Sequence, residues 1–341
     1  MGKSHTVTLK ELSKKLNLSI STVSRALNDH PDISATTVER VKKLANELNY
    51  APNLFAKGFR SKHTHIIGVI VPNISHLYTS TILKGIIDQA ESLGYRVIVS
   101  ESKNDEIKQV EMLKTMIQFG TDGILMSLAK KTTSVNTILN LLPHIPIVLF
   151  DKVSDKIPCT QIVINEEEAA FNAVEHLIGL GKNRIAILKE TENSYNSEKR
   201  FAGYTRALLT NNIPIKDKLI LSTEDISLIN GRRLTNLLLS MKKRPDAIFA
   251  ITDNAAIGAI QALNKFNIKI PEEIAVVGFS NSVNSKIIVP NLTTVDQPGE
   301  RIGRTAVDYL IDEIDHPNDA LITKTIEIKT NLVVRDSSFK G

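Results

Sequence analysis

The side chains with the clearest chemical role lie in the stretch SISTVSRALN at positions 19–28. If this stretch is a helix, Ile20, Ser21, Ser24 and Arg25 fall on its outer face near its N-terminal end. Hydroxyl groups and an arginine fork can hydrogen-bond to base edges in the major groove of DNA. We therefore interpret 19–28 as a recognition helix whose first residues read bases. A generic helical hairpin is the alternative, because many short amphipathic pairs share this pattern.

Two short helices and a tight turn must position these side chains. Thr8 and Glu11 have the spacing of a capping box, so the pattern predicts a first helix that begins at Leu9. The turn runs through 16–18, and Ser19 can cap the second helix. The inward-facing residues would be Leu9, Leu12, Ser13 and Leu16 on the first helix, and Val23, Ala26 and Leu27 on the second.

A third helix completes the predicted headpiece. Either Ser34 or Thr36 can cap it, and an apolar stripe follows at positions 38, 41, 44, 45 and 48. Thr36, Lys42 and Lys43 are candidates for phosphate contacts, which position a protein on DNA without specifying sequence.

The positive charge of the chain is concentrated at its N-terminal end. Residues 1–62 carry 11 Lys and Arg against 5 Asp and Glu, whereas the remaining residues carry 31 against 32. A basic segment attached to a nearly neutral body is typical of a nucleic-acid-binding module. A solvated surface with extra lysines is the alternative explanation.

The composition of the 341 residues argues against several other classes of protein. The single cysteine, Cys159, excludes an internal disulfide and fits a reducing cytoplasm. The N-terminus has no apolar run of signal-peptide length, and no stretch approaches the roughly 20 apolar residues of a membrane span. The eight histidines are scattered without metal-binding spacing, and no phosphate loop or nucleophile elbow is present. We expect no enzyme, no metal, no cofactor and no membrane contact.

From Ile66 onward, continuous apolar strands alternate with amphipathic helices, which predicts parallel sheets covered on both faces. A second such series begins at Cys159. The predicted fold is an all-α headpiece followed by two doubly wound α/β lobes, with ligands at the carboxyl ends of the strands. The predicted domains are a headpiece at 1–50, a hinge at 51–64, and a two-lobe domain at 65–341. In that domain we assign about 65–157 and 296–320 to the first lobe, and about 158–292 and 321–341 to the second.

The sequence resembles the lac repressor (LacI/GalR) family of bacterial regulators. Leu18-Ser19 and Thr22-Val23-Ser24-Arg25 match its headpiece signature, although Ser13 replaces the usual alanine. Strings such as IIGVIVPN, GTDGILM, KRFAGYTRAL, ITDNAAIGAIQAL and EIAVVGF extend the resemblance to about residues 6–335, and link the chain to periplasmic sugar-binding proteins. The resemblance implies a cytoplasmic homodimer that represses metabolic genes from a near-palindromic operator and responds to a small-molecule effector.

The resemblance also implies which residues contact DNA. In the headpiece these are Thr8, Ser19, Ile20, Ser21, Thr22, Ser24, Arg25 and Asn28. In the hinge they are Asn53, Lys57 and Phe59. Phe59 stands where the family usually has the leucine that wedges into the minor groove, and phenylalanine is a known wedge residue. The alternative for this stretch is a flexible linker, which Gly58 would favour.

The effector residues implied by the resemblance are Tyr78, Ser127, Asp151, Arg200, Asp253 and Phe279. The structural alternatives are a cap or an interlobe ion pair for the two aspartates, lid packing for Tyr78 and core packing for Phe279. The chain departs from the family at Ser280-Asn281, where an aspartate is frequent, and at Ile226, where several sugar-responsive members have an aromatic residue. A carbohydrate is the leading effector class, with a nucleobase, a sugar phosphate or another metabolite as alternatives.

Three other functions remain open at this point. One is a sugar-binding transport protein, which the basic headpiece argues against. Another is a cytoplasmic α/β enzyme that would turn over its cleft ligand. The third is an activator, or a repressor that needs a corepressor, because the sequence does not give the sign of the coupling.

Overall fold

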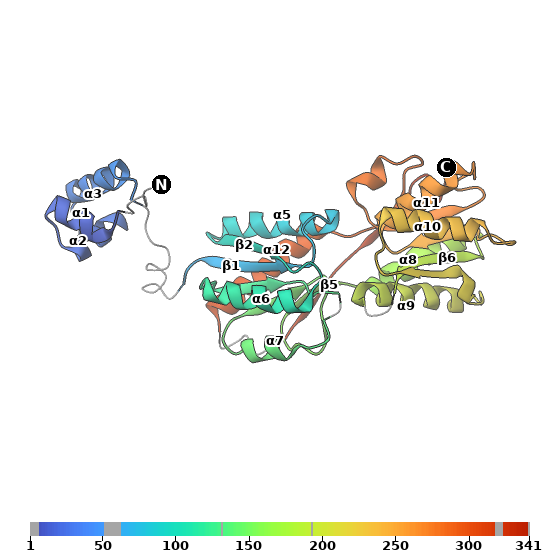
Figure 1. The fold of residues 1–341 in the computed structure, drawn as a ribbon, viewed down its shortest axis with the longest axis horizontal. Coiled ribbons are helices and arrows are strands. Elements are labelled where there is room, and N and C mark those ends of the chain that lie inside the picture. Colours follow the sequence, from blue (N-terminus) through green and yellow to red (C-terminus); the bar gives the residue numbers. More distant parts are fainter. Residues whose placement is uncertain (1–6, 51–62, 131, 192–193, 318–322, 340–341) are drawn as a thin grey trace. The chain divides into compact units, whose positions relative to one another are not determined.

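The computed structural model describes residues 7–50, 63–130, 132–191, 194–317 and 323–339, and the chain divides into two compact units at 1–64 and 65–341. The N-terminal unit contains helices α1 (Leu9–Leu16), α2 (Ile20–Leu27) and α3 (Ala35–Glu47) (Figure 1). Its core is formed by Leu12, Val23, Ala26, Val41 and Ala45. The three predicted helices are confirmed. The hinge residues Asn53, Lys57 and Phe59 lie outside the described residues.

The first lobe of the second unit is a six-stranded sheet with strand order β11-β5-β4-β3-β1-β2, and every neighbouring pair is parallel. Helices α5 and α12 pack on one face, and α6 and α7 on the other (Figure 1). The strands are β1 (Ile66–Val71), β2 (Arg96–Glu101), β3 (Gly123–Met126), β4 (Ile147–Phe150), β5 (Gln161–Ile164) and β11 (Thr325–Ile328). The helices are α5 (Leu77–Ser92), α6 (Glu106–Gln118), α7 (Asn136–Leu141) and α12 (Gly299–Asp315).

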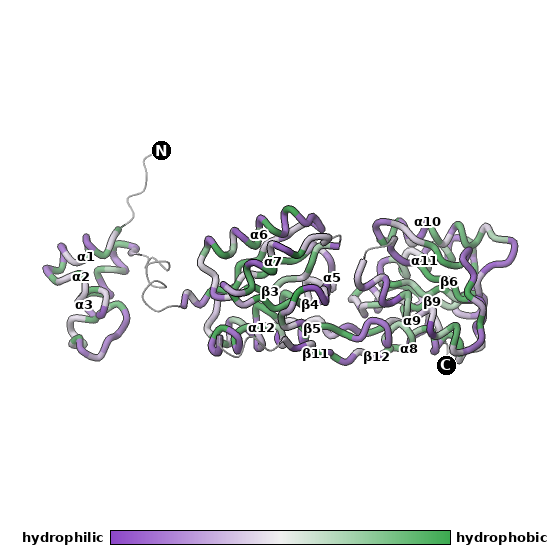
Figure 2. Tube along the Cα trace, turned by 90° about the horizontal axis from the view of Figure 1, so that it is seen from below, coloured by the Kyte–Doolittle hydropathy of each residue, from purple (hydrophilic) through white to green (hydrophobic). Residues whose placement is uncertain are grey.

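The second lobe repeats this plan with strand order β12-β10-β9-β8-β6-β7, in which only β12 is antiparallel to its neighbour. Its strands are β6 (Ile185–Glu190), β7 (Ile220–Thr223), β8 (Ala247–Ala250), β9 (Ala275–Ser280), β10 (Thr293–Asp296) and β12 (Asn331–Val333). Its helices are α8 (Glu166–Gly179), α9 (Tyr195–Thr210), α10 (Leu228–Leu239) and α11 (Asp253–Lys265). Figure 2 shows hydrophobic strands at the centre of each lobe, as expected for sheets buried on both faces.

The predicted boundary between the lobes was wrong. Strand β5 pairs with β4 and strand β11 pairs with β5, so 161–164 and 325–328 belong to the first lobe and not to the second. The chain therefore passes between the sheets three times, after β5, after β10 and after β11. The error has a physical origin: an apolar run identifies a buried strand, but the identity of its hydrogen-bonded neighbours depends on residues far away in the sequence.

Candidate nucleic-acid interface and ligand cleft

The turn between α1 and α2 is held by local hydrogen bonds. The backbone N–H of Glu11 donates to Thr8 Oγ1 at 3.3 Å, and the N–H of Thr8 donates to Glu11 Oε2 at 2.8 Å, which completes the predicted capping box. Asn17 adopts a left-handed conformation with φ 54° and ends α1. Ser19 Oγ accepts from the N–H of Thr22 at 3.0 Å and caps α2. The capping box fixes the start of α1, and the contacts at Asn17 and Ser19 fix the turn from which α2 begins.

The outer face of α2 carries the predicted base-reading residues. Ile20 is exposed, as are Ser21, Arg25 and Asn28, whereas Ser24 is half-buried. Ile20 is an apolar side chain exposed on the surface of the headpiece. Such a side chain can contact the methyl group of thymine in the major groove. The hydroxyls of Ser19 and Thr22 lie 2.8 Å apart at the helix start, so both are engaged in the cap. The Ser21 hydroxyl also lies 2.7 Å from Ser19 Oγ. Ile20 and Arg25 are thus the groups most available to bases.

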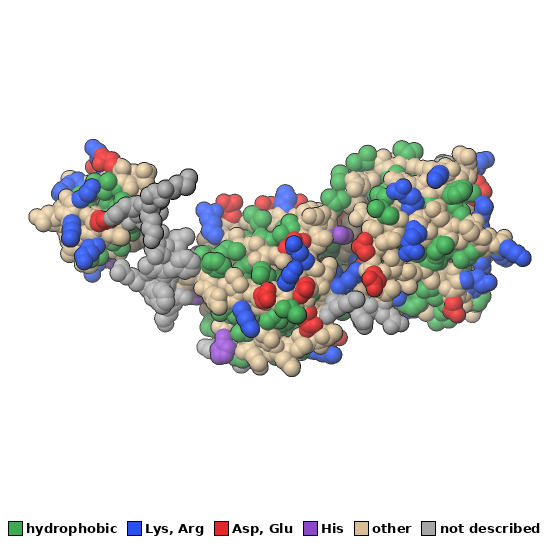
Figure 3. Space-filling model, in the orientation of Figure 1, with side chains coloured by type: hydrophobic (Ala, Val, Ile, Leu, Met, Phe, Trp, Pro, Cys, Tyr) green, Lys and Arg blue, Asp and Glu red, His purple; other side chains and the backbone are tan. Residues whose placement is uncertain are grey.

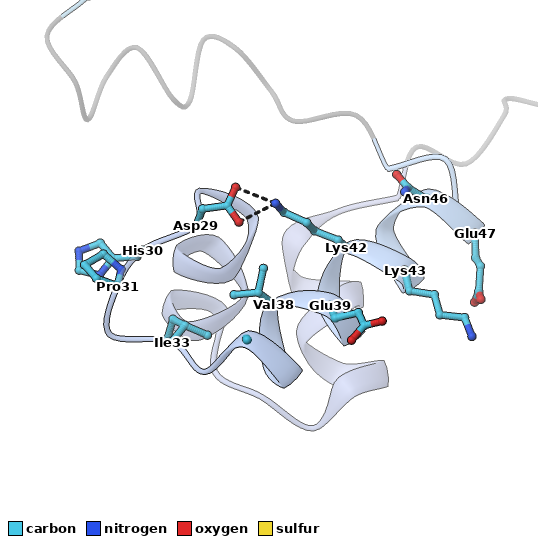
Figure 4. A pocket seen from close by; sticks show the side chains of 11 residues that line it. Asp29, His30, Pro31, Ile33, Val38, Glu39, Lys42, Lys43, Asn46 and Glu47 are labelled. Carbon is cyan, nitrogen blue, oxygen red and sulfur yellow. Dashed lines mark hydrogen bonds and ion pairs between the residues drawn. The ribbon is translucent and has the colours of Figure 1, made fainter.

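Acidic residues restrain two of the cations in the headpiece. Arg25 Nη1 lies 3.9 Å from Asp32 Oδ2, and both side chains are mostly exposed. Lys42 Nζ donates to both carboxylate oxygens of Asp29 at 2.6 Å (Figure 4). Lys42 is therefore already paired in the headpiece, whereas Lys43 is exposed and remains the better candidate for a phosphate. Ser34 and not Thr36 caps α3.

In the second unit, a cavity of about 350 Å³ lies between the two lobes. It is lined by residues that end or follow β1, β2, β3 and β4 in the first lobe and β6, β7, β8, β9 and β10 in the second. This is the carboxyl edge of both sheets, where ligands of parallel sheets bind. Figure 3 shows acidic, basic and histidine side chains at the junction of the lobes.

Three of the predicted effector residues line this cavity: Tyr78, Asp151 and Arg200. Burial raises the pKa of the Tyr78 phenol well above its ordinary value, so its hydroxyl stays protonated and can donate. Ser127 is buried behind the wall, and its hydroxyl lies 3.5 Å from Asp151 Oδ2. Phe279 is fully buried, with the guanidinium carbon of Arg200 3.6 Å from its ring centroid. Ser127 and Phe279 therefore do not line the cavity themselves. They contact two residues that do, Asp151 and Arg200.

Asp253 is hydrogen-bonded within the protein, as in the structural alternative, and its predicted contact with a ligand stays a prediction. Its Oδ1 accepts from the Thr294 hydroxyl at 2.5 Å, and its Oδ2 accepts from the N–H of Ser282 at 2.6 Å. It does not line the 350 Å³ cavity, where its neighbour Asn254 lies instead. Both carboxylate oxygens of Asp253 thus accept hydrogen bonds from the protein. Through Asp253, these bonds connect β10 to the loop that follows β9.

Asp151 and Arg200 are oriented by charged and polar partners. Asp151 has a left-handed φ of 60°, and it accepts from Lys152 Nζ at 3.0 Å and from Asn196 Nδ2 in the other lobe at 2.9 Å. Burial by itself would raise the pKa of Asp151, but Lys152, Asn196 and Arg200 together hold it below its ordinary value. Arg200 Nε donates to Glu166 Oε2 at 2.6 Å, and its Nη1 donates to the Ile251 carbonyl at 2.5 Å. Asp151 is therefore kept ionised by its partners, and the direction of the Arg200 guanidinium is fixed by Glu166 and Ile251.

Sequence reasoning missed a lysine that joins the two lobes across the cleft. Lys130, which follows β3, places Nζ 2.5 Å from Glu190 Oε1 and 2.9 Å from the carbonyl oxygen of Glu224. Glu190 ends β6, and Glu224 follows β7. The only indication in the sequence that these residues line the cleft is their position. Lys130, Glu190 and Gln297 all lie at or just beyond the carboxyl end of a strand.

Comparison with known proteins agrees with both units. Residues 8–53 match the family described as bacterial regulatory proteins, lacI family, and residues 174–338 match the periplasmic binding protein-like domain. The NTD biosynthesis operon regulator NtdR of Bacillus subtilis is 32% identical over 331 residues, which span 97% of this chain and 99% of that protein. The chain belongs to the lacI family of bacterial regulatory proteins.

Other lacI-family relatives support the same assignment. Catabolite control protein A of Priestia megaterium is 32% identical over 305 residues, or 89% of this chain and 91% of that protein. The lac repressor dimer, solved with operator and the anti-inducer ONPF, superposes with a TM-score of 0.88 at 26% identity and covers 98% of this chain and 100% of its own. Family membership confirms the predicted fold and the predicted class, a DNA-binding transcriptional regulator and not an enzyme.

Within the part of the chain that the structure describes, no helix is both long and apolar enough to cross a membrane. The same residues contain no group of three or more His, Cys, Asp or Glu that could hold a metal ion.

Proposed function

We propose that this lacI-family protein is a cytoplasmic, dimeric repressor that binds a near-palindromic operator and changes its DNA affinity when a small molecule, a carbohydrate in the first instance, enters the cleft. The observation that carries the proposal is the full-length similarity to a repressor solved as a dimer on its operator. A two-fold symmetric protein places its two recognition helices on two related half-sites, so the operator must be close to a palindrome.

The exposed face of α2 supports the DNA-binding part of the proposal. Arg25 reaches a base edge, and Ile20 and Ser21 set the half-site preference. Lys43 and the exposed Thr36 contact phosphates and position the headpiece. Asn53, Lys57 and Phe59 lie outside the described residues; in this proposal all three contact DNA, and Phe59 opens the minor groove.

The cleft supports the regulatory part of the proposal. Its walls come from both lobes, and two contacts already cross it, Asp151 to Asn196 and Lys130 to Glu190. A ligand that touches both walls changes the relative stability of the lobe arrangements, and it regulates DNA binding only if it binds those arrangements with different affinity.

The experiment that tests this function is a selection of random DNA duplexes by the purified full-length protein, repeated with a panel of small metabolites. We expect recovery of a near-palindrome in at least one condition, and a metabolite that changes the recovery identifies the effector and the sign of its effect. Recovery of no specific sequence in any condition would contradict the proposed operator binding.

A further inference from the structure

The loop between α2 and α3 is tied to both of these helices. The backbone N–H of His30 donates to the Arg25 carbonyl of α2 at 3.1 Å. Asp29 has a left-handed φ of 53°, and its carboxylate accepts from Lys42 of α3 at 2.6 Å (Figure 4). At the far end of the loop, the N–H of Ile33 donates to the His30 carbonyl at 3.1 Å, and the Ile33 side chain packs against the headpiece core. The loop therefore has a defined course in the headpiece.

This loop places the Asp32 carboxylate beside the arginine that we expect to read a base. Arg25 Nη1 lies 3.9 Å from Asp32 Oδ2, and the two side chains are 56% and 64% exposed, respectively. His30, from the same loop, places Nδ1 3.3 Å from the same carboxylate oxygen. An ion pair as exposed as Arg25–Asp32 contributes little to folding stability. The main effect of the pair is therefore expected where Arg25 contacts DNA.

An arginine that reads a base uses only part of its hydrogen-bonding capacity. The guanidinium has five N–H donors in a planar fork, and a bidentate contact with the O6 and N7 acceptors of guanine uses two of them. The remaining donors can keep a carboxylate partner at the same time. A carboxylate that already holds the fork also lowers the entropic cost of ordering a long, flexible side chain on binding. Arg25 can therefore contact guanine and Asp32 together.

We infer that Asp32 is a positioning residue for Arg25, which it holds in the direction from which the guanidinium reads a guanine, and that it thereby sets the base preference at one position of the half-site. The inference rests on the proposed function, because it concerns DNA contact by α2. It goes further because it assigns a base to Arg25. It also gives a role in base discrimination to a residue outside the set that the sequence predicts to contact DNA.

Positioning and simple charge repulsion predict different results when the Asp32 charge is removed. Asp32 is an anion beside a DNA-binding surface, so its neutralisation should strengthen binding to every DNA sequence. Loss of the positioning contact should at the same time weaken the preference of Arg25 for guanine. Repulsion alone would strengthen binding to all sequences by the same factor, and the base preference would not change.

The test measures the affinity of the full-length protein for four duplexes, in the condition in which the selection recovers a specific sequence. These are the recovered duplex and its three variants at the base pair where Arg25→Ala relaxes the preference. For Asp32→Asn we expect the preference for guanine to fall about fivefold, near the lower limit of the discrimination that one bidentate contact supplies. Affinity for a random-sequence duplex should be unchanged or higher, which also shows that the headpiece is folded. Unchanged preference for guanine overturns the inference, as does a preferred base other than guanine at this position.

Asp29→Asn is the matched control for this variant. It removes the same charge from the same loop, but its partner is Lys42 and not Arg25. Asparagine also tolerates the left-handed φ of this position. We expect Asp29→Asn to shift the affinities for all four duplexes together and to leave the preference for guanine unchanged. An equal loss of preference in the Asp29 and Asp32 variants would mean that the charge of the loop, and not the contact with Arg25, sets the preference.

A double variant decides whether Asp32 acts through Arg25. In the Arg25→Ala background, Asp32→Asn should leave the remaining base preference unchanged, because the side chain that it positions is absent. A further fall in preference in this background overturns the positioning role, since Asp32 would then contact the base pair itself.

The inference and the proposed function fail in different ways. Recovery of no specific duplex in any condition refutes the proposed function and the inference with it. Recovery of a specific duplex for which Asp32→Asn keeps the full preference for guanine refutes the inference alone.

Discussion

The contact between Lys130 and Glu190 predicts a measurable energetic coupling between the two lobes. Lys130 Nζ lies 2.5 Å from the Glu190 carboxylate, and the side chains are 20% and 13% exposed. Exposed pairs contribute about 0–1 kcal/mol, whereas loss of one partner from a buried pair costs about 3–5 kcal/mol. The Lys130–Glu190 pair is intermediate in exposure between these two cases. We therefore expect a coupling energy of about 1–2 kcal/mol between the two side chains.

A double-mutant cycle measures this coupling. Lys130→Met, Glu190→Gln and the double variant would be unfolded in urea and followed by tyrosine fluorescence, since the chain has six tyrosines and no tryptophan. The exposed pair between Arg96 and Glu91 gives a matched control cycle, for which we expect no measurable coupling. Equal coupling in the two cycles would refute the claim that Lys130 holds the lobes together.

Three other predictions follow from the same contacts. Arg25→Ala should weaken specific operator binding by about 1–3 kcal/mol and relax one base position in a selection experiment, whereas equal weakening on all sequences would make Arg25 a phosphate contact. Because the pKa of Asp151 is lowered in the fold, the stability it contributes is present above its unfolded pKa of about 3.9 and is lost as pH falls through the folded value. As pH falls, the free energy of unfolding should therefore decrease more steeply for the natural chain than for Asp151→Asn. Parallel curves of unfolding free energy against pH would argue against an ionised, paired Asp151. Thr294→Val removes a hydroxyl that donates to Asp253 at 2.5 Å and should destabilise the chain by about 1–3 kcal/mol in urea, while Thr115→Val on α6, which only loses a bond to its own helix, should have a smaller effect.

The headpiece could be predicted from sequence because the signals that form it are local. The capping box of Thr8 and Glu11 and the cap at Ser19 each act over three residues. The apolar stripes repeat at helical spacing, so Leu12, Val23 and Val41 were recognisable as core residues. The alternating α/β pattern was equally visible, since strands buried on both faces are continuous apolar runs.

The cleft was harder to predict because its contacts join distant residues. Asp253 looked like a ligand-binding carboxylate, but its partner Thr294 lies 41 positions away. The hydrogen bond from Asn196 to Asp151 spans 45 positions and joins two lobes. Nothing in the local pattern shows that Gln297 has an unpaired amide, because that depends on which groups surround it after folding.

The most direct test of ligand-dependent DNA binding is a reciprocal linkage measurement. Operator affinity would be measured with and without saturating cleft ligand, and ligand affinity with and without operator duplex. Because coupling between two sites is reciprocal, we predict that both affinities change by the same factor, in the range of about 5–150. A ligand that binds the cleft tightly but changes neither affinity would contradict regulation through the cleft.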